Sequence, residues 1–136
     1  MTKAIPTVQK FMTTTPHSIG TDQTLAHAHS VMQEHKIRHL PVLVGGKLVG
    51  MLTERDLRLV ESLKDVDPKV VKVEDAMSTN VYAVGPDAPL DEVVRDMAEH
   101  KYGSVVVLQN NKVVGIFTTV DACRALHDLL HGRLAK

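Results

Sequence analysis

The amino-acid sequence contains two similar halves, and residues of the second half follow their counterparts at a constant spacing of 65 positions. This spacing aligns matching residues along most of the chain without a gap. The pairs are Met12 with Met77, Gly20 with Gly85, Met32 with Met97, His35 with His100, Lys47 with Lys112 and Asp56 with Asp121. So many matches in one register indicate two copies of one structural unit. Two similar halves also favour a site where the copies meet.

The length of the chain limits how these copies can fold. Each half of a 136-residue chain is too small to bury a comfortable core alone, so we expect the copies to share one core. Hydrophobic residues make up 43% of the chain and include only two Phe and two Tyr, so this core is mainly aliphatic. We predict repeats at 8–64 and 73–131, joined by a linker at 65–72, which together form one globular module.

Charge and cysteine content exclude several classes of protein. Lys and Arg balance Asp and Glu at 16 each, which removes the electrostatic argument for nonspecific binding to nucleic acid. The single cysteine, Cys123, cannot form an internal disulfide. The sequence has no signal segment and no apolar run near 18 residues, so we expect a soluble cytoplasmic protein without a membrane partner.

Each copy predicts the same order of elements: a helical turn, a short strand, a helix, two strands joined by a tight turn, and a second helix. In the first copy these lie near 8–12, 18–19, 25–36, 40–44, 47–52 and from 53 onward, and in the second near 73–77, 83–84, 90–101, 104–109, 112–117 and from 118 onward. Thr24 is a suitable cap for the helix that follows it. Gly45-Gly46 and Asn110-Asn111 tolerate the positive φ angles of two-residue hairpins. This order predicts an α+β (α/β-type) fold.

Two short segments at strand-to-helix junctions are the best candidates for chemistry. Thr53 precedes Asp56 by three residues, and Thr118 precedes Asp121 in the same way. One interpretation is a capping box, which stabilises the start of a helix without any ligand. The other is a nucleotide site, because free backbone N–H groups suit a phosphate and a carboxylate can hold ribose hydroxyls.

The doubled pattern resembles a pair of CBS domains over about nine tenths of the chain. The residues that carry the resemblance are Met12, Asp22, Leu25, Met32, Leu40-Pro41-Val42, Val49-Gly50, Thr53 and Asp56, with their counterparts in the second copy. The domain is named after cystathionine β-synthase, but nothing here resembles the catalytic part of that enzyme, so no enzyme activity is expected. The resemblance implies two β-α-β-β-α repeats packed sheet to sheet about a pseudo-twofold axis, with two clefts between them.

The resemblance also implies a regulatory module whose clefts bind adenosine compounds such as AMP, ADP, ATP or S-adenosylmethionine. The first cleft would combine His17, Ile37, Arg38 and His39 with Thr118 and Asp121. The second would combine Tyr82, Tyr102 and Ser104 with Thr53, Arg55 and Asp56. In this interpretation Asp121 and Asp56 hold ribose, Ile37 and Tyr102 pack on the base, and the backbone around His17 contacts the adenine edge.

The clefts are not equivalent, because Arg38, His39 and Arg55 are replaced by Gly103, Ser104 and Val120 in the second copy. Arg38 is the best candidate for a phosphate contact. We therefore predict an adenine nucleotide as regulatory ligand, no required cofactor, a homodimer and an unidentified protein partner.

Two alternatives stay open at this point. One is a ligand-free protein-interaction module whose Thr and Asp residues are only caps. The other is a metal-responsive protein that uses its histidine-rich helices, because Cys123, His127 and His131 follow one another at i, i+4 spacing. Metal binding there would need a partner chain, and the predicted site contains no metal ligand.

Overall fold

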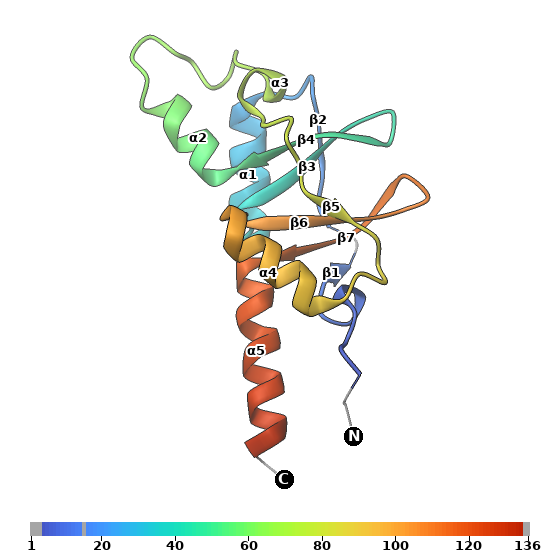
Figure 1. Cartoon of the computed structure of the whole chain (residues 1–136). Helices are drawn as coiled ribbons and strands as arrows, with labels where there is room; N and C mark the ends of the chain where they lie inside the picture. Colours follow the sequence, from blue (N-terminus) through green and yellow to red (C-terminus); the bar gives the residue numbers. More distant parts are fainter. Residues whose placement is uncertain (1–3, 15, 135–136) are drawn as a thin grey trace. The chain divides into compact units, whose positions relative to one another are not determined.

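The computed structural model describes residues 4–14 and 16–134 and divides them into two compact units. The continuous unit contains Pro16–Val81. The discontinuous unit contains the described residues of 1–15 together with those of 82–136. The elements in chain order are η1 (Val8–Lys10), β1 (Thr13–Thr14), β2 (Ile19–Gly20), α1 (Leu25–His35), β3 (His39–Val44), β4 (Lys47–Thr53), α2 (Glu54–Glu61), α3 (Val73–Ala76), β5 (Ala83–Val84), α4 (Leu90–His100), β6 (Ser104–Gln109), β7 (Lys112–Thr118) and α5 (Thr119–Leu134), as labelled in Figure 1.

The continuous unit is a three-stranded sheet with the order β2-β3-β4 and helices α1 and α2 packed against it. The hairpin between β3 and β4 turns at Gly45 and Gly46, which have φ angles of +56° and +82°. Helix α1 starts where the Thr24 hydroxyl accepts a hydrogen bond from the His27 N–H at 3.1 Å, and it ends at Lys36 in the left-handed region. The Glu54 N–H donates to the Arg38 carbonyl at 2.9 Å, which places the start of α2 beside the residue that precedes β3.

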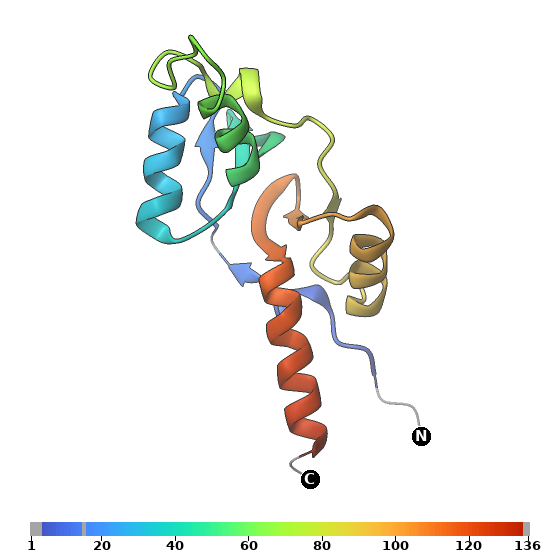
Figure 2. The ribbon, with the colours of Figure 1, turned by 90° about the vertical axis from the view of Figure 1, so that its left-hand side faces the viewer.

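The discontinuous unit has a four-stranded sheet with the order β1-β7-β6-β5. Its edge strand β1 comes from the start of the chain and pairs antiparallel with β7, so that Thr13 lies opposite Ile116. The preceding residue Val8 is fully buried and donates its N–H to the Ala88 carbonyl at 2.9 Å. Figures 1 and 2 show α5 running well past the strands of this unit. Residues 4–14 are thus part of the fold of the second copy.

The buried side chains form two clusters, one in each unit. The single shared core expected from the chain length stays a prediction. The first contains Ile19, Leu25, Ala28, Met32, Leu40, Val42, Leu52, Leu57 and Val73. The second contains Val8, Leu90, Val93, Met97, Val105, Val107, Phe117 and Ala125. Val73, which the sequence analysis assigned to the second repeat, packs in the first cluster, and Val8, assigned to the first repeat, packs in the second. Each of these residues adds apolar side-chain volume to a small core.

Most local predictions are confirmed. The cap at Thr24, the two-residue turns and the helix starts after Thr53 and Thr118 are all present. The strand expected at 18–19 lies at Ile19–Gly20, and β1 was not expected at all. No described helix is both long and apolar enough to cross a membrane.

Gly50 and Gly115 occupy equivalent positions in β4 and β7, and we predict that alanine is worse at Gly50. A Cβ at Gly50 would lie 2.6 Å from Met77 Sδ and 2.9 Å from the Ser78 carbonyl oxygen, which is fixed by its bridge to Met51. The three atoms nearest to a Cβ at Gly115 all belong to the side chain of Met12. Gly50→Ala should therefore cost about 1–3 kcal/mol, and Gly115→Ala less. Urea denaturation of both variants measures this, and an equal loss would contradict it.

Candidate strand-to-helix site

The first strand-to-helix segment forms a complete capping box. The Thr53 N–H donates to Asp56 Oδ2 at 2.9 Å, and the Asp56 N–H donates to Thr53 Oγ1 at 3.2 Å. The Thr53 hydroxyl also lies 3.0 Å from Asp56 Oδ2. No hydrogen bond within the described residues engages Asp56 Oδ1. A half-buried carboxylate with one free oxygen can still accept hydrogen bonds from a ligand.

The second strand-to-helix segment has the same box and two further contacts. Asp121 Oδ2 accepts from the Thr118 N–H at 2.9 Å and lies 3.2 Å from the Thr118 hydroxyl, while the Asp121 N–H donates to Thr118 Oγ1. The Thr13 hydroxyl, from β1, donates to Asp121 at 3.2 Å from Oδ1, and Arg124 lies 3.9 Å from the same oxygen. Asp121 is only 6% exposed. Groups of the protein therefore occupy more of the hydrogen-bonding capacity of the Asp121 carboxylate than of the Asp56 carboxylate.

A pocket of about 380 Å³ opens beside the first capping box, at the start of β3 and α2. It is lined by Arg38, His39, Thr53, Glu54, Arg55 and Arg58. Four of these residues are predicted site residues, although the sequence assigned Arg38 and His39 to one cleft and Thr53 and Arg55 to the other. They meet because His39 and Thr53 are paired across the β3–β4 ladder. The pocket carries an excess of positive charge.

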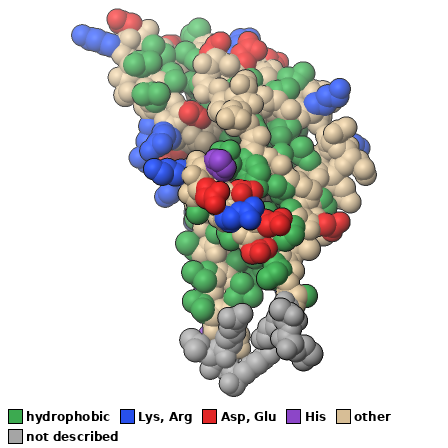
Figure 3. Space-filling view, in the orientation of Figure 1, with side chains coloured by type: hydrophobic (Ala, Val, Ile, Leu, Met, Phe, Trp, Pro, Cys, Tyr) green, Lys and Arg blue, Asp and Glu red, His purple; other side chains and the backbone are tan. Residues whose placement is uncertain are grey.

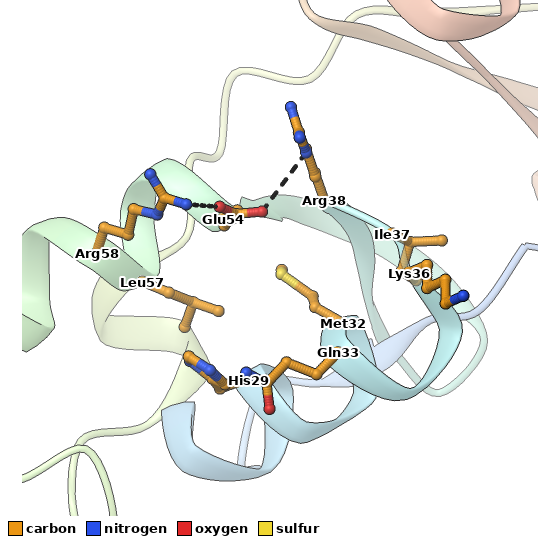
Figure 4. A pocket seen from close by; sticks show the side chains of 9 residues that line it. All are labelled: His29, Met32, Gln33, Lys36, Ile37, Arg38, Glu54, Leu57 and Arg58. Atoms are coloured by element: carbon orange, nitrogen blue, oxygen red, sulfur yellow. Dashed lines mark ion pairs between the residues drawn. The ribbon is translucent and has the colours of Figure 1, made fainter.

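A second pocket of about 370 Å³ lies between α1 and α2 and shares part of this wall. Its lining is His29, Met32, Gln33, Lys36, Ile37, Arg38, Glu54, Leu57 and Arg58. Figure 4 shows the apolar side chains of Met32 and Leu57 in the centre and marks the ion pairs that Arg38 and Arg58 form with Glu54. Ile37, which the sequence placed against a base, contributes to this apolar surface.

Burial and a neighbouring charge change the protonation of His39. Desolvation lowers the pKa of His39 below its usual 6.5, the positive charge of Arg38 lowers it further, and Asp56 opposes both effects. The imidazole is therefore neutral at pH 7 and can accept a hydrogen bond as well as donate one.

The lowered pKa of His39 predicts a loss of stability in mild acid. Below pH 6.5 the unfolded chain takes up this proton before the folded chain does, so stability falls as the pH drops through 6.5 toward the folded pKa. His39→Gln removes this proton uptake and leaves the other histidines in place. Urea denaturation midpoints at pH 7.5, 6.5 and 5.5 should therefore fall more steeply in the parent protein. Parallel pH profiles would contradict the prediction.

The predicted residues of the discontinuous unit form a separate group. Tyr82 donates its hydroxyl to Asp96 at 2.9 Å, and burial together with this bond raises the pKa of Tyr82 to about 12. Its ring lies 4.9 Å from the ring of Tyr102, centroid to centroid. Ser104 pairs with Thr118 across the β6–β7 ladder. Acidic side chains surround a basic one over α4 in Figure 3. This face therefore has a charge opposite to that of the pocket beside the first capping box.

His17 lies in the continuous unit, where its exposed ring stacks on that of His35 with centroids 3.6 Å apart. The structure thus places His17, Ile37, Arg38, His39, Thr53, Arg55 and Asp56 in one unit and Tyr82, Tyr102, Ser104, Thr118 and Asp121 in the other. The pairing of these two sets into two clefts stays a prediction.

The histidine-rich helices do not form a metal centre in the part of the chain that the structure describes. Residues 4–14 and 16–134 contain no group of three or more His, Cys, Asp or Glu side chains placed to hold a metal ion. The rings of His127 and His131 stack with centroids 5.6 Å apart, and Cys123 is exposed on the same helix.

Sequence reasoning missed Glu54 and Arg58 as pocket residues and Thr13 as a partner of Asp121. The i, i+4 spacing of Glu54 and Arg58 is a recognisable ion-pair signal on a helix. No local signal indicates Thr13, because its contact depends on a strand pairing across most of the chain.

Comparison with known proteins decides the family. The CBS domain model matches residues 8–62 and 73–128. The chain belongs to the CBS domain family. The CBS domain-containing protein YhcV of Bacillus subtilis is 32% identical over 114 residues, which are 84% of this chain and 81% of that protein. The two family matches make the chain a tandem CBS pair.

Solved structures of CBS proteins share the fold. A putative acetoin utilization protein (AcuB) from Vibrio cholerae is 29% identical, has a TM-score of 0.87 and is matched over 98% of both chains. The CBS domain pair of protein MJ0100, in complex with 5-methylthioadenosine and S-adenosyl-L-methionine, is 27% identical with a TM-score of 0.82, over 92% and 98% of the chains. CBSX2 in complex with AMP is 26% identical with a TM-score of 0.81, over 90% and 97%. Adenosine compounds therefore bind to two of these CBS neighbours.

Proposed function

We propose that this CBS pair is a cytoplasmic regulatory module that binds a phosphorylated adenosine ligand of the AMP, ADP and ATP class. The observation that carries the proposal is the pocket in which Arg38, His39, Thr53 and Arg55 meet beside the Asp56 carboxylate. It offers cationic donors for phosphate and an oxygen acceptor for ribose hydroxyls within one small region. The adenosine complexes of two CBS neighbours support the choice of ligand. No catalytic step is part of the proposal.

The proposed ligand site combines residues from both units. The family resemblance implies two sets, His17, Ile37, Arg38 and His39 with Thr118 and Asp121, and Tyr82, Tyr102 and Ser104 with Thr53, Arg55 and Asp56. Because Arg38, His39, Thr53 and Arg55 line one pocket, we propose that one ligand uses these four residues together and that residues of the other unit complete its site. A ligand that bridges the units would favour one arrangement of the repeats over others. At 100 times its dissociation constant it would stabilise that arrangement by about 2.7 kcal/mol.

A thermal-shift titration with AMP, ADP, ATP, S-adenosylmethionine and NADH tests the proposal. We expect an adenine nucleotide to raise the melting temperature and Asp56→Ala to remove most of the increase. The quantity to compare is the ligand-induced increase, because loss of the cap lowers the melting temperature even without ligand. Asp128→Ala, an exposed position on α5, is the control. If no compound raises the melting temperature, the ligand-free interaction module with simple caps is the better account.

The output of the module is proposed to pass through a homodimer or another protein. Leu126, Leu129 and Leu130 on α5 are 57%, 42% and 48% exposed, which leaves apolar surface for a partner. Light scattering at micromolar concentration should give twice the mass of the chain. Leu126→Asp should lower the measured mass toward that of a single chain. A monomeric parent protein would exclude the homodimer.

A further inference from the structure

The carboxylate of Glu54 lies between two arginines of the continuous unit. Arg38 Nε is 3.6 Å from Glu54 Oε2, and Arg58 Nη2 is 2.5 Å from Glu54 Oε1. Figure 4 marks both ion pairs of this one carboxylate, one with Arg38, the residue before β3, and one with Arg58 on α2. The arrangement demonstrates that Arg38 and Arg58 can converge on a single anion, with Glu54 as the anion that the protein itself supplies.

A third arginine adds to the same surface. Arg55 lines the pocket that also contains Arg38 and Arg58, and all three side chains are largely exposed. With His39 neutral, three arginines and one glutamate leave a net charge of two positive units. A phosphate group that displaces Glu54 would meet three free guanidinium groups. Each of them can donate two parallel hydrogen bonds to phosphate oxygens, which is more than a single phosphate group needs.

The fold does not require these charges, as the second copy demonstrates. At the equivalent positions of the discontinuous unit, Arg38, Glu54, Arg55 and Arg58 are replaced by Gly103, Thr119, Val120 and Cys123. The hairpin, the capping box and the following helix form there in the same way. The cluster is thus a property of one repeat only.

From these observations we infer that Arg38, Arg55 and Arg58 form a polyphosphate subsite, and that the chain binds one adenosine di- or triphosphate there. This inference rests on the proposed function and narrows its ligand class. Glu54 acts as an internal competitor of the ligand. Its carboxylate forms ion pairs with Arg38 and Arg58 when the subsite is empty, and these ion pairs break when a phosphate group binds the two arginines. The second copy, without arginines at these positions, takes no polyphosphate. Uncharged or cationic adenosine compounds would leave the cluster paired with Glu54 and bind more weakly.

Calorimetric titration of the full chain with AMP, ADP and ATP tests the inference, with inorganic tripolyphosphate as a probe that lacks adenosine. We expect ATP to bind about tenfold or more tightly than AMP, with a stoichiometry of one per chain. Arg58→Gln should weaken ATP binding by roughly tenfold and AMP binding much less. Glu54→Gln should strengthen ATP binding several-fold, a gain that a misfolded variant cannot imitate. Arg95→Gln, which removes an exposed arginine paired with Asp96 in the other unit, is the control.

The outcomes separate this inference from the proposed function. Equal binding of AMP and ATP, unaffected by Arg58→Gln, would overturn the polyphosphate subsite and leave the adenosine site in place. Tripolyphosphate binding without any nucleotide binding would overturn the adenosine site and keep the subsite. Weaker ATP binding in Glu54→Gln would show that the glutamate assists the ligand, which contradicts its role as a competitor. Absence of all binding would overturn both.

Discussion

Val8→Asp will unfold the discontinuous unit while the continuous unit keeps its structure. Val8 is fully buried among Leu90, Val93 and other residues of the second copy. An unpaired charge in such a place costs about 3–5 kcal/mol, which is a large part of the stability of a small unit. The substitution lies at the beginning of the chain, yet its effect is expected in strands that start at Ser104.

Hydrogen exchange with peptide resolution measures this effect. Amides of β6 and β7 should lose protection, whereas those of β3 and β4 keep it. Ile5→Asp is the matched control, because Ile5 belongs to the same segment and is 53% exposed. Retained protection in β6 and β7 would contradict the assignment of the first residues to this unit.

Asp121→Ala is expected to destabilise the protein by about 2–4 kcal/mol, and Asp56→Ala by about 1 kcal/mol. Both substitutions remove a capping box, but Asp121 is 6% exposed and also accepts from the Thr13 hydroxyl. Its loss leaves the Thr118 N–H without its partner and releases β1 from the start of α5. Hydrogen bonds to a charged acceptor are worth more than neutral ones, which explains the larger figure.

Urea denaturation of the two variants, without ligand, provides the comparison. Thr13→Val tests the extra contact directly, because it removes the hydroxyl and retains the shape of the side chain. We expect it to reproduce a minor part of the Asp121→Ala effect. Equal losses for Asp56→Ala and Asp121→Ala would show that the contact with β1 adds nothing. Asp56 is therefore the better position for ligand experiments, because its substitution is expected to destabilise the fold less than that of Asp121.

The sequence predicts the elements of this protein much better than their assembly. The helix caps at Thr24 and Thr53 and the turns at Gly45-Gly46 and Asn110-Asn111 are local, so nearby residue types determine them. The strand β1 contains two residues, which is too short for any periodic pattern. One indirect signal existed: Gly115 in the middle of an apolar strand indicates close approach of another segment, and that segment contains Met12.

The same distinction applies to the site. The Thr-to-Asp spacing and the likeness between the copies identified both strand-to-helix junctions as candidates. They did not reveal that Arg38 and Arg58 share Glu54, because this contact joins the start of β3 to α2 through tertiary packing. Nor did the sequence distinguish Asp56 from Asp121, which is 6% exposed and accepts a hydrogen bond from the Thr13 hydroxyl.

The contribution of the first residues to the last sheet also has a consequence for synthesis on the ribosome. The segment with Val8 and Thr13 leaves the exit tunnel before its partner strand β7, which follows about 100 residues later. At 5–20 residues per second the wait is about 5–20 s. Residues Pro16–Val81 contain all strands and helices of their own unit, and we expect this unit to begin folding during that interval. The nascent chain therefore keeps the segment with Val8 and Thr13 unpaired during this interval, and the segment can join its sheet only after β7 has been synthesised.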